Sequence, residues 1–200
     1  YTNWKIRYMR SRERWEITLE DGSVIVYGGD ESHPTAIQYV VRWKNWIGSS
    51  SLAISPFPFE PYQQRLAMMW NLSESVNINN DKVWYEYEKI EQKVGPGEFA
   101  EFHTEASYVS TIENALGYSV DFNYQTKEAY EYYEPHTEVD ERQSGVYDAN
   151  QERYERKNLE SLDVNFNNDP IQHITLNYHS LNKLSSDDQF KKRLLSSVSR

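Results

Sequence analysis

The sequence contains no cysteine and no long apolar run. The absence of cysteine excludes disulfide bridges, thiol catalysis and cysteine-ligated metals. No stretch reaches about 18 consecutive apolar residues, the length at which a segment becomes a candidate transmembrane helix. The sequence starts at Tyr1 in place of methionine and has no visible signal peptide, so we expect a processed or trimmed chain.

Basic residues are in deficit, with 21 Lys and Arg against 31 Asp and Glu and a formal net charge of −10. This balance argues against nucleic-acid binding, which depends on cations that contact phosphates. The deficit is uneven, because residues 1–14 are basic whereas residues 127–160 are acidic and rich in tyrosine. Two interpretations stay open: two solvated faces, or a head-to-tail contact between the basic strand of one copy and the acidic segment of the next.

Catalytic and cofactor motifs are also missing. The glycines have neither the spacing of a phosphate loop nor that of a dinucleotide-binding turn. The histidines form no helical or paired ligand motif. Glutamates near aromatic residues leave glycoside hydrolysis as the nearest enzymatic alternative, although with 31 acidic residues some carboxylate pair meets the required spacing by chance. We therefore expect a protein that is not an enzyme and that holds neither cofactor nor metal.

Aromatic residues, in contrast, are abundant, with 16 Tyr, 7 Phe and 6 Trp. Large rings suit half-buried sheets and recognition surfaces, where they stack on sugars or lie at a membrane interface. The competing interpretation is core packing for the tryptophans and a solvent-exposed loop for the tyrosines at 130–133. The candidate ligand contacts are Trp43, Trp46, Trp84, Tyr130, Tyr132 and Tyr133.

Residues 98–125 alternate apolar and polar residues almost without a break. Successive strand residues face opposite sides, so this period of two predicts a long amphipathic β-hairpin with a polar tip at residues 113–117. Such a hairpin either covers a soluble core or crosses a membrane. Its polar side is predicted to include His103 and Glu105. The residues with which its apolar side would contact a second copy or a membrane are Phe102, Tyr108, Ile112, Val120 and Phe122.

Alternation and turn residues predict strands elsewhere as well. Residues 13–20 and 23–27 are expected to form a hairpin around Asp21-Gly22. The other predicted strands are 3–9, 36–47, 52–55, 82–94 and 171–178.

The remaining segments are predicted to be helices and loops. Residues 62–70 are expected to form a short helix, and residues 186–197 an amphipathic helix capped by Ser186. Residues 73–81 are predicted to be a loop, and residues 127–160 an acidic, Tyr-rich excursion with a helical turn between 148 and 162. The expected fold is mainly β: a long-stranded antiparallel sheet or β-sandwich in one elongated domain at 1–185, followed by the C-terminal helix at 186–200.

Three consecutive features connect the segment Lys89–Thr126 to a known family. A long strand ends in Val94-Gly95-Pro96-Gly97, an alternating strand follows, and a second one ends in Val120-Asp121-Phe122-Asn123-Tyr124. This arrangement resembles a segment of the aerolysin/epsilon-toxin-type β-pore-forming proteins. The resemblance implies a secreted, elongated β protein that binds a cell surface and oligomerises through shared strands.

Taken together, these features predict a non-enzymatic β protein that recognises a surface and associates with itself, in a secreted or extracellular location. A β-pore-forming, toxin-like protein is the finer form of this prediction. The alternatives are a viral coat or crystal-forming structural protein, located in a virion in the viral case, and a lectin-like glycan-binding module. The expected partners are further copies of the chain and a glycan, cell-surface or membrane ligand. Asn71-Leu72-Ser73 also matches the acceptor sequence for N-glycosylation.

Overall fold

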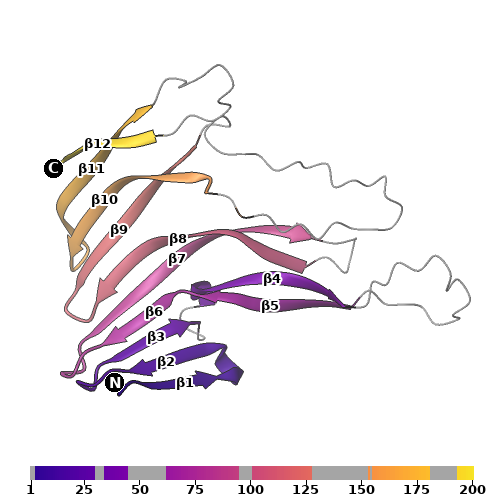
Figure 1. Cartoon of the computed structure of the whole chain (residues 1–200). Helices are drawn as coiled ribbons and strands as arrows, with labels where there is room; N and C mark the ends of the chain where they lie inside the picture. The colour runs from indigo at the N-terminus through magenta and orange to yellow at the C-terminus, as the bar shows by residue number, and fades with distance from the viewer. Residues whose placement is uncertain are drawn as a thin grey trace, which may run out of the picture.

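The computed structural model of the chain describes residues 3–29, 34–44, 62–94, 101–127, 153, 155–180 and 193–200. Ten strands form one antiparallel sheet in which neighbours in space follow one another along the chain (Figure 1). Their order is β1 (Lys5–Met9), β2 (Arg14–Thr18), β3 (Val24–Gly28), β6 (Leu72–Val76), β7 (Lys82–Val94), β8 (Glu101–Asn114), β9 (Tyr118–Thr126), β10 (Lys157–Phe166), β11 (Asp169–Ser180) and β12 (Arg193–Ser199). The predicted mainly β, long-stranded antiparallel sheet is confirmed.

A separate two-stranded ribbon is inserted between β3 and β6. Its strands, β4 (Ile37–Lys44) and β5 (Tyr62–Trp70), pair antiparallel along their whole length. In Figure 1 this β4–β5 ribbon lies beside β7 and β8, and β4 contacts β8 directly.

The predicted hairpins around Asp21-Gly22 and around residues 113–117 both form. Gly22, between β2 and β3, has a φ of 89° and donates its amide to the Leu19 carbonyl at 3.1 Å. Between β8 and β9, the side chain of Asn114 accepts hydrogen bonds from the amides of Leu116 and Tyr118 at 3.0 Å each. Glycine adopts such positive φ values without the steric cost of a side chain.

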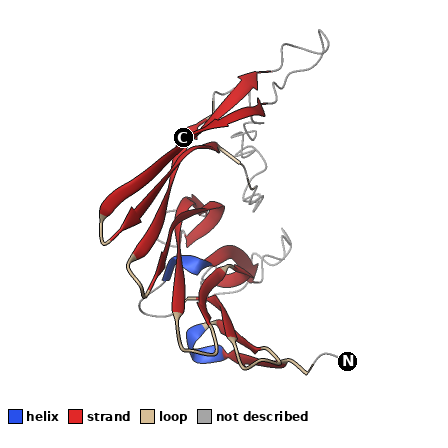
Figure 2. Cartoon of the chain, turned by 90° about the vertical axis from the view of Figure 1, so that its left-hand side faces the viewer, coloured by secondary structure: helices blue, strands red, loops and turns tan. Residues whose placement is uncertain are grey.

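The sheet divides at the second of these hairpins. β8 and β9 pair only close to their turn, where Thr111–Glu113 face Ser119–Asp121. Farther from the turn β8 follows β7, whereas β9 follows β10, and Figure 2 shows the resulting curved, divided sheet. The register of β8 against β7 skips Glu105 and Ser110, and such bulges bend a strand and increase its twist.

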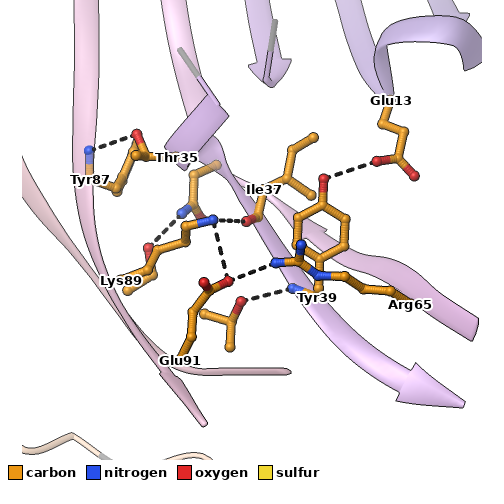
Figure 3. Close-up of polar contacts among 11 residues, drawn as sticks. Glu13, Thr35, Ile37, Tyr39, Arg65, Tyr87, Lys89 and Glu91 are labelled. Carbon is orange, nitrogen blue, oxygen red and sulfur yellow. Dashed lines mark hydrogen bonds and ion pairs between the residues drawn. The ribbon is translucent and has the colours of Figure 1, made fainter. Parts of the chain in front are cut away.

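Polar contacts attach the β4–β5 ribbon to the sheet (Figure 3). The hydroxyl oxygen of Thr104 on β8 accepts a hydrogen bond from the Tyr39 amide at 3.0 Å. Lys89 on β7 donates to the Ile37 carbonyl at 3.4 Å. Both sheet residues therefore bond to backbone atoms of β4, which fixes the position of this strand.

A second group of contacts surrounds the ring of Tyr39. Arg65 of β5 lies over the ring, with its guanidinium carbon 3.9 Å from the centroid, and pairs with Glu91 of β7 at 2.7 Å. The Tyr39 hydroxyl donates to Glu13 at 3.0 Å. Burial, assisted by this carboxylate, raises the pKa of Tyr39 to about 12.

The core is centred on β8, which is covered on both faces. Four consecutive residues, from His103 to Ala106, are buried, with His103 only 1% exposed. Thr104 faces the ribbon, while Glu105 pairs with Arg156. The expected division of this strand into a buried apolar side and a solvent-facing polar side is therefore wrong here. His103 and Glu105, expected on the polar side, are buried, whereas Phe102, expected on the apolar side, is 45% exposed. The bulge at Glu105 reverses the alternation, and elements on both faces exclude solvent.

Both predicted helices are wrong where the structure describes them. Residues 62–70 form β5, because a nine-residue helix is marginal by itself and pairing with β4 satisfies the backbone of both strands. Residues 193–199 form β12, which pairs with β11, and the rest of the 186–197 helix lies outside the described residues. In the described part of the chain the helices are two short 3-10 turns, η1 (Arg10–Arg12) and η2 (Pro34–Ala36).

Two further predictions need correction. The predicted loop at 73–81 begins within β6, where the Ser73 hydroxyl donates to the Val26 carbonyl at 3.3 Å. The helical turn expected to end at residue 162 is a strand from 157 onward. The predicted strand at 52–55, residues 45–47 of the strand at 36–47 and most of the 127–160 excursion lie outside the described residues.

Candidate functional site

The strands β9 to β12 share one apolar face. Directly paired residues lie on the same side of a sheet, and the pairs here include Phe122 with Leu162 and Tyr178 with Leu195. Alternation and register together define the apolar face as Tyr118, Val120, Phe122, Tyr124, Leu159, Leu162, Val164, Phe166, Ile174, Leu176, Tyr178, Leu195 and Val198.

The opposite side of the same strands is a polar face whose side chains bond from strand to strand. Asn123 donates to Asp163 at 2.6 Å, and Asn165 donates to Asp121 at 2.8 Å. His173 lies 2.5 Å from the other oxygen of Asp163. The hydrogen bonds from His173 and Asn123 lower the pKa of Asp163. These polar groups form hydrogen bonds with one another. The apolar face is therefore the side of these strands whose side chains would gain from being covered.

The residues of the apolar face are half-buried or exposed, and none is fully buried. Exposure is greatest on β12, where Leu195 is 53% and Val198 58% exposed. The main contacts of β10, β11 and β12 are with adjacent strands of the sheet. Exposed, contiguous apolar surface rimmed by polar residues is typical of an interaction site.

Tyr124 of the apolar face contacts a second tyrosine, Tyr108, across the division of the sheet. The rings of Tyr108 on β8 and Tyr124 on β9 lie 5.2 Å apart. The Tyr124 hydroxyl donates to the Val109 carbonyl at 2.8 Å, and the Tyr108 hydroxyl accepts from the amides of Arg156 and Lys157 at 2.8 and 3.2 Å. Burial raises the pKa of both phenols. The side chains thus hold together strands whose backbones have separated.

Charged residues cross the same division. Arg156 pairs with the buried carboxylate of Glu105, and Lys157 pairs with Glu88. Burial raises the pKa of Glu105, and Arg156 opposes this effect. Burial also lowers the pKa of His103, with Arg153 as a smaller contribution. No hydrogen-bond partner for Nδ1 of His103 is present among the described residues. These two pairs connect β10 and the residue before it to β7 and β8, and Glu105 is the one member of the pairs that is buried.

The structure brings together only some of the residues proposed from the hairpin. Val120 and Phe122 belong to the apolar face, and Ile112 pairs directly with Val120. Tyr108 is buried and contacts Tyr124. Phe102 lies near the opposite end of β8 from Ile112 and takes no part in this group.

The proposed aromatic ligand contacts do not gather in the described part of the chain. Trp84 is half-buried on β7 and pairs with Glu74 and Glu113, away from the apolar face. Trp43 belongs to β4, but its side chain is outside the described residues. Trp46, Tyr130, Tyr132 and Tyr133 lie outside them as well.

Sequence reasoning missed most of the apolar face. The alternation from Leu159 to Val164 is interrupted at Glu160, which the register of β10 against β9 skips. In β12 the adjacent Leu194 and Leu195 resemble part of the apolar stripe of an amphipathic helix. The register of β12 against β11 skips Ser196. A search for alternation that tolerates one inserted residue would have found both strands.

Two negative findings complete the description of the site. In the described ranges, no three His, Asp or Glu side chains gather in a way that could hold a metal ion. None of the helices described is long and apolar enough to cross a membrane.

Comparisons with known proteins give a likeness of fold. No protein-family model and no curated protein sequence matches the chain. Among solved structures, the N-terminal domain of effector protein SpvB from Salmonella typhimurium strain LT2 superposes with a TM-score of 0.54 at 10% sequence identity. The match covers 100% of this chain and 65% of that one. The chain shares the fold of the SpvB N-terminal domain.

A second solved structure, of TcdB2-TccC3-TEV, gives a TM-score of 0.48 at 12% identity, with 90% of this chain and 10% of that chain covered. The likeness to the SpvB domain shows the fold alone at this level of identity. The likeness found extends over the whole chain and is to this domain, not specifically to the aerolysin-type proteins expected of residues 89–126.

Proposed function

We propose that the chain is a non-enzymatic β module that recognises a protein surface and associates with a second copy of itself. The observation that carries this proposal is the apolar face of β9–β12. Two copies related by a two-fold axis would each cover the face of the other. Covering such a surface is favourable by about 25 cal/mol for each Å² of apolar area removed from water.

The distribution of charge supports this choice of partner. The chain carries a net charge of −10, so most approaches between two copies are repulsive. On this side of the sheet the acidic residue is Asp169, at the turn between β10 and β11, whereas Asp121 and Asp163 lie on the opposite side in hydrogen bonds. Contact through the apolar face therefore avoids the repulsion that other orientations carry.

The proposed setting is outside the cell that makes the protein. The support is the shared fold with a domain of a protein described as an effector. The chain spans 65% of the length of that domain chain, and we extend to it only the setting. Pore formation is the finer proposal, and release of a trapped dye from liposomes would separate it from association without lipid.

A matched pair of substitutions tests self-association. Leu176 and Asn177 are neighbours on β11 whose side chains face opposite sides of the sheet. We expect Leu176→Asp to reduce the molar mass measured by light scattering to that of the monomer, and Asn177→Asp to leave the mass of the wild type. Equal masses for both variants would contradict the proposal.

A second variant distinguishes loss of self-association from loss of folding. Leu195 is 53% exposed, so Leu195→Ser removes apolar surface with little effect on the free energy of unfolding. We expect it to weaken self-association while the circular dichroism spectrum remains that of the wild type. A folded Leu195→Ser chain that associates as tightly as the wild type would count against the apolar face as the contact.

A further inference from the structure

We infer that the outer edge of β12 is a site of strand addition, at which an extended segment of another polypeptide pairs antiparallel with this strand. The segment it fits has apolar residues alternating with Ser or Thr, and carboxylates at its ends. This contact uses backbone groups at the edge of the sheet. It is therefore separate from the apolar face and does not depend on self-association.

The topology leaves two open edges. β1 and β12 are the terminal strands of the sheet, and each has one neighbour among the described residues. An unpaired edge presents a row of N–H and C=O groups that another strand can pair with. On β12, residues 194–200 are all exposed, so no described part of the chain covers this edge.

The two edges differ in the features that prevent strand addition. β1 carries Lys5 and Arg7 within five residues, and η1 continues it with two more arginines. Charged side chains of this kind are the usual protection of an edge strand. β12 has seven residues, and between Leu194 and Ser199 it contains neither a charged residue nor proline. Its edge is longer than that of β1, and apart from the skipped Ser196 it has none of these protections between Leu194 and Ser199.

The side chains of β12 define what the added strand must offer. Leu195 and Val198 continue the apolar face, while Ser197 and Ser199 lie within 3.2 and 3.5 Å of the Asn177 amide on the polar face. An added strand extends both faces if its residues alternate between apolar and hydroxyl side chains.

Charge argues for another polypeptide over a second copy of β12. Arg193 is the first residue of β12, and Arg200 directly follows its last residue. If two copies of β12 paired so that Leu195 faced Val198, Arg193 would face Arg200 at both ends, and like charges directly opposite are destabilising. Carboxylates at the ends of the added strand would instead form opposite-charge pairs with these arginines.

The test uses a fluorescent synthetic peptide in which valines alternate with serine and threonine between terminal aspartates, added to the full chain. Two versions are methylated on backbone nitrogens, one at alternate residues and the other at the intervening residues. We expect one version to bind like the unmodified peptide and the other to lose about tenfold in affinity, because only alternate N–H groups of a strand face its neighbour. Absence of binding, or equal binding of both versions, would overturn the inference.

Two charge-reversal variants show which edge strand, β12 or β1, binds the peptide. We expect Arg200→Glu to weaken binding of the aspartate-ended peptide and to strengthen binding of a lysine-ended one. The same reversal on β1, Arg7→Glu, should change neither. A larger effect of Arg7→Glu would place the site on β1 and reject β12. Molar mass measured on the same samples reports self-association independently, so either proposal can fail alone.

Discussion

Gly28 shows how a single residue holds two parts of the fold together. It ends β3 with a φ of 95°, and its amide donates to the Asn71 carbonyl at 2.8 Å. A Cβ at this position would lie 2.5 Å from the Glu13 carbonyl oxygen and 2.7 Å from Cδ1 of Trp70. Only glycine allows the end of β3 to approach both the η1 turn and β5 this closely.

We therefore expect Gly28→Ala to be much more destabilising than Gly22→Ala. Both glycines have positive φ, which costs a non-glycine residue about 1–2 kcal/mol. A Cβ on Gly22 meets nothing within 4 Å, whereas Gly28→Ala adds an overpacking cost of about 1–3 kcal/mol. Urea unfolding of the two variants measures the difference, and equal losses would show that the close approach at Gly28 is absent.

His103 links stability to pH. Burial lowers its pKa from 6.5, so the folded chain resists a proton that the unfolded chain binds. Above pH 6.5, His103 is neutral in both states and does not reduce the free energy of unfolding. Below pH 6.5 the free energy of unfolding falls as the pH decreases toward the lowered pKa.

His103→Gln removes the titrating imidazole and supplies in its place a neutral side-chain amide that can still form hydrogen bonds. We expect the difference in unfolding free energy between wild type and variant to change below pH 6.5 in the direction that favours the variant, and to be constant between pH 7 and 8. Denaturation at a series of pH values measures it. A constant difference across the whole range would mean that His103 is not buried in the neutral form.

At the scale of elements, the β4–β5 ribbon depends on its polar attachment to β8. Thr104 is 0% exposed and accepts the hydrogen bond of the Tyr39 amide. Thr104→Val keeps the shape of the side chain but leaves that amide unpaired, at a cost of about 1–3 kcal/mol. We expect hydrogen exchange of the amides in β4 to accelerate more than that of the amides in β2. Uniform acceleration would show that the ribbon and the sheet unfold together.

The strands that could be predicted from the sequence are those in which alternation is continuous. β7 and the β8–β9 hairpin fall in this group, because Lys82–Val94 and the tip at Asn114–Gly117 contain clear signals. β5 and β12 could not be predicted in the same way. Their Leu, Met, Gln and Arg residues favour helices slightly, and the competing term, backbone pairing with β4 and β11, comes from distant sequence.

The candidate site was predictable in its β9 part and in β11, where alternation over residues 171–178 is continuous, but not in β10 or β12. Val120 and Phe122 follow from alternation, but their partners on β10 are reached across a segment of acidic residues and a skipped residue at Glu160. No local pattern indicates that Leu162 faces Phe122, since this pairing depends on the division of the sheet after Glu113. The burial of His103 and Glu105 likewise results from elements that pack against both faces of β8.

At the scale of the whole molecule, the sheet combines a covered part and an uncovered part. β7 and β8 carry the ribbon, and most of the buried side chains belong to β8 and to the ribbon strand β4. In contrast, β9 to β12 present an apolar face that the described residues leave half-exposed. The shared fold with the SpvB N-terminal domain extends over both parts. This difference between the two parts is the physical basis for proposing association as the function.

The molar mass of the wild-type chain, measured by sedimentation over a concentration series without lipid, tests this account most directly. The monomer has a mass of 23.7 kDa. We expect the mass to rise with concentration toward twice that value. A mass that stays at 23.7 kDa over the whole series would contradict the proposal that the apolar face of β9–β12 binds a second copy.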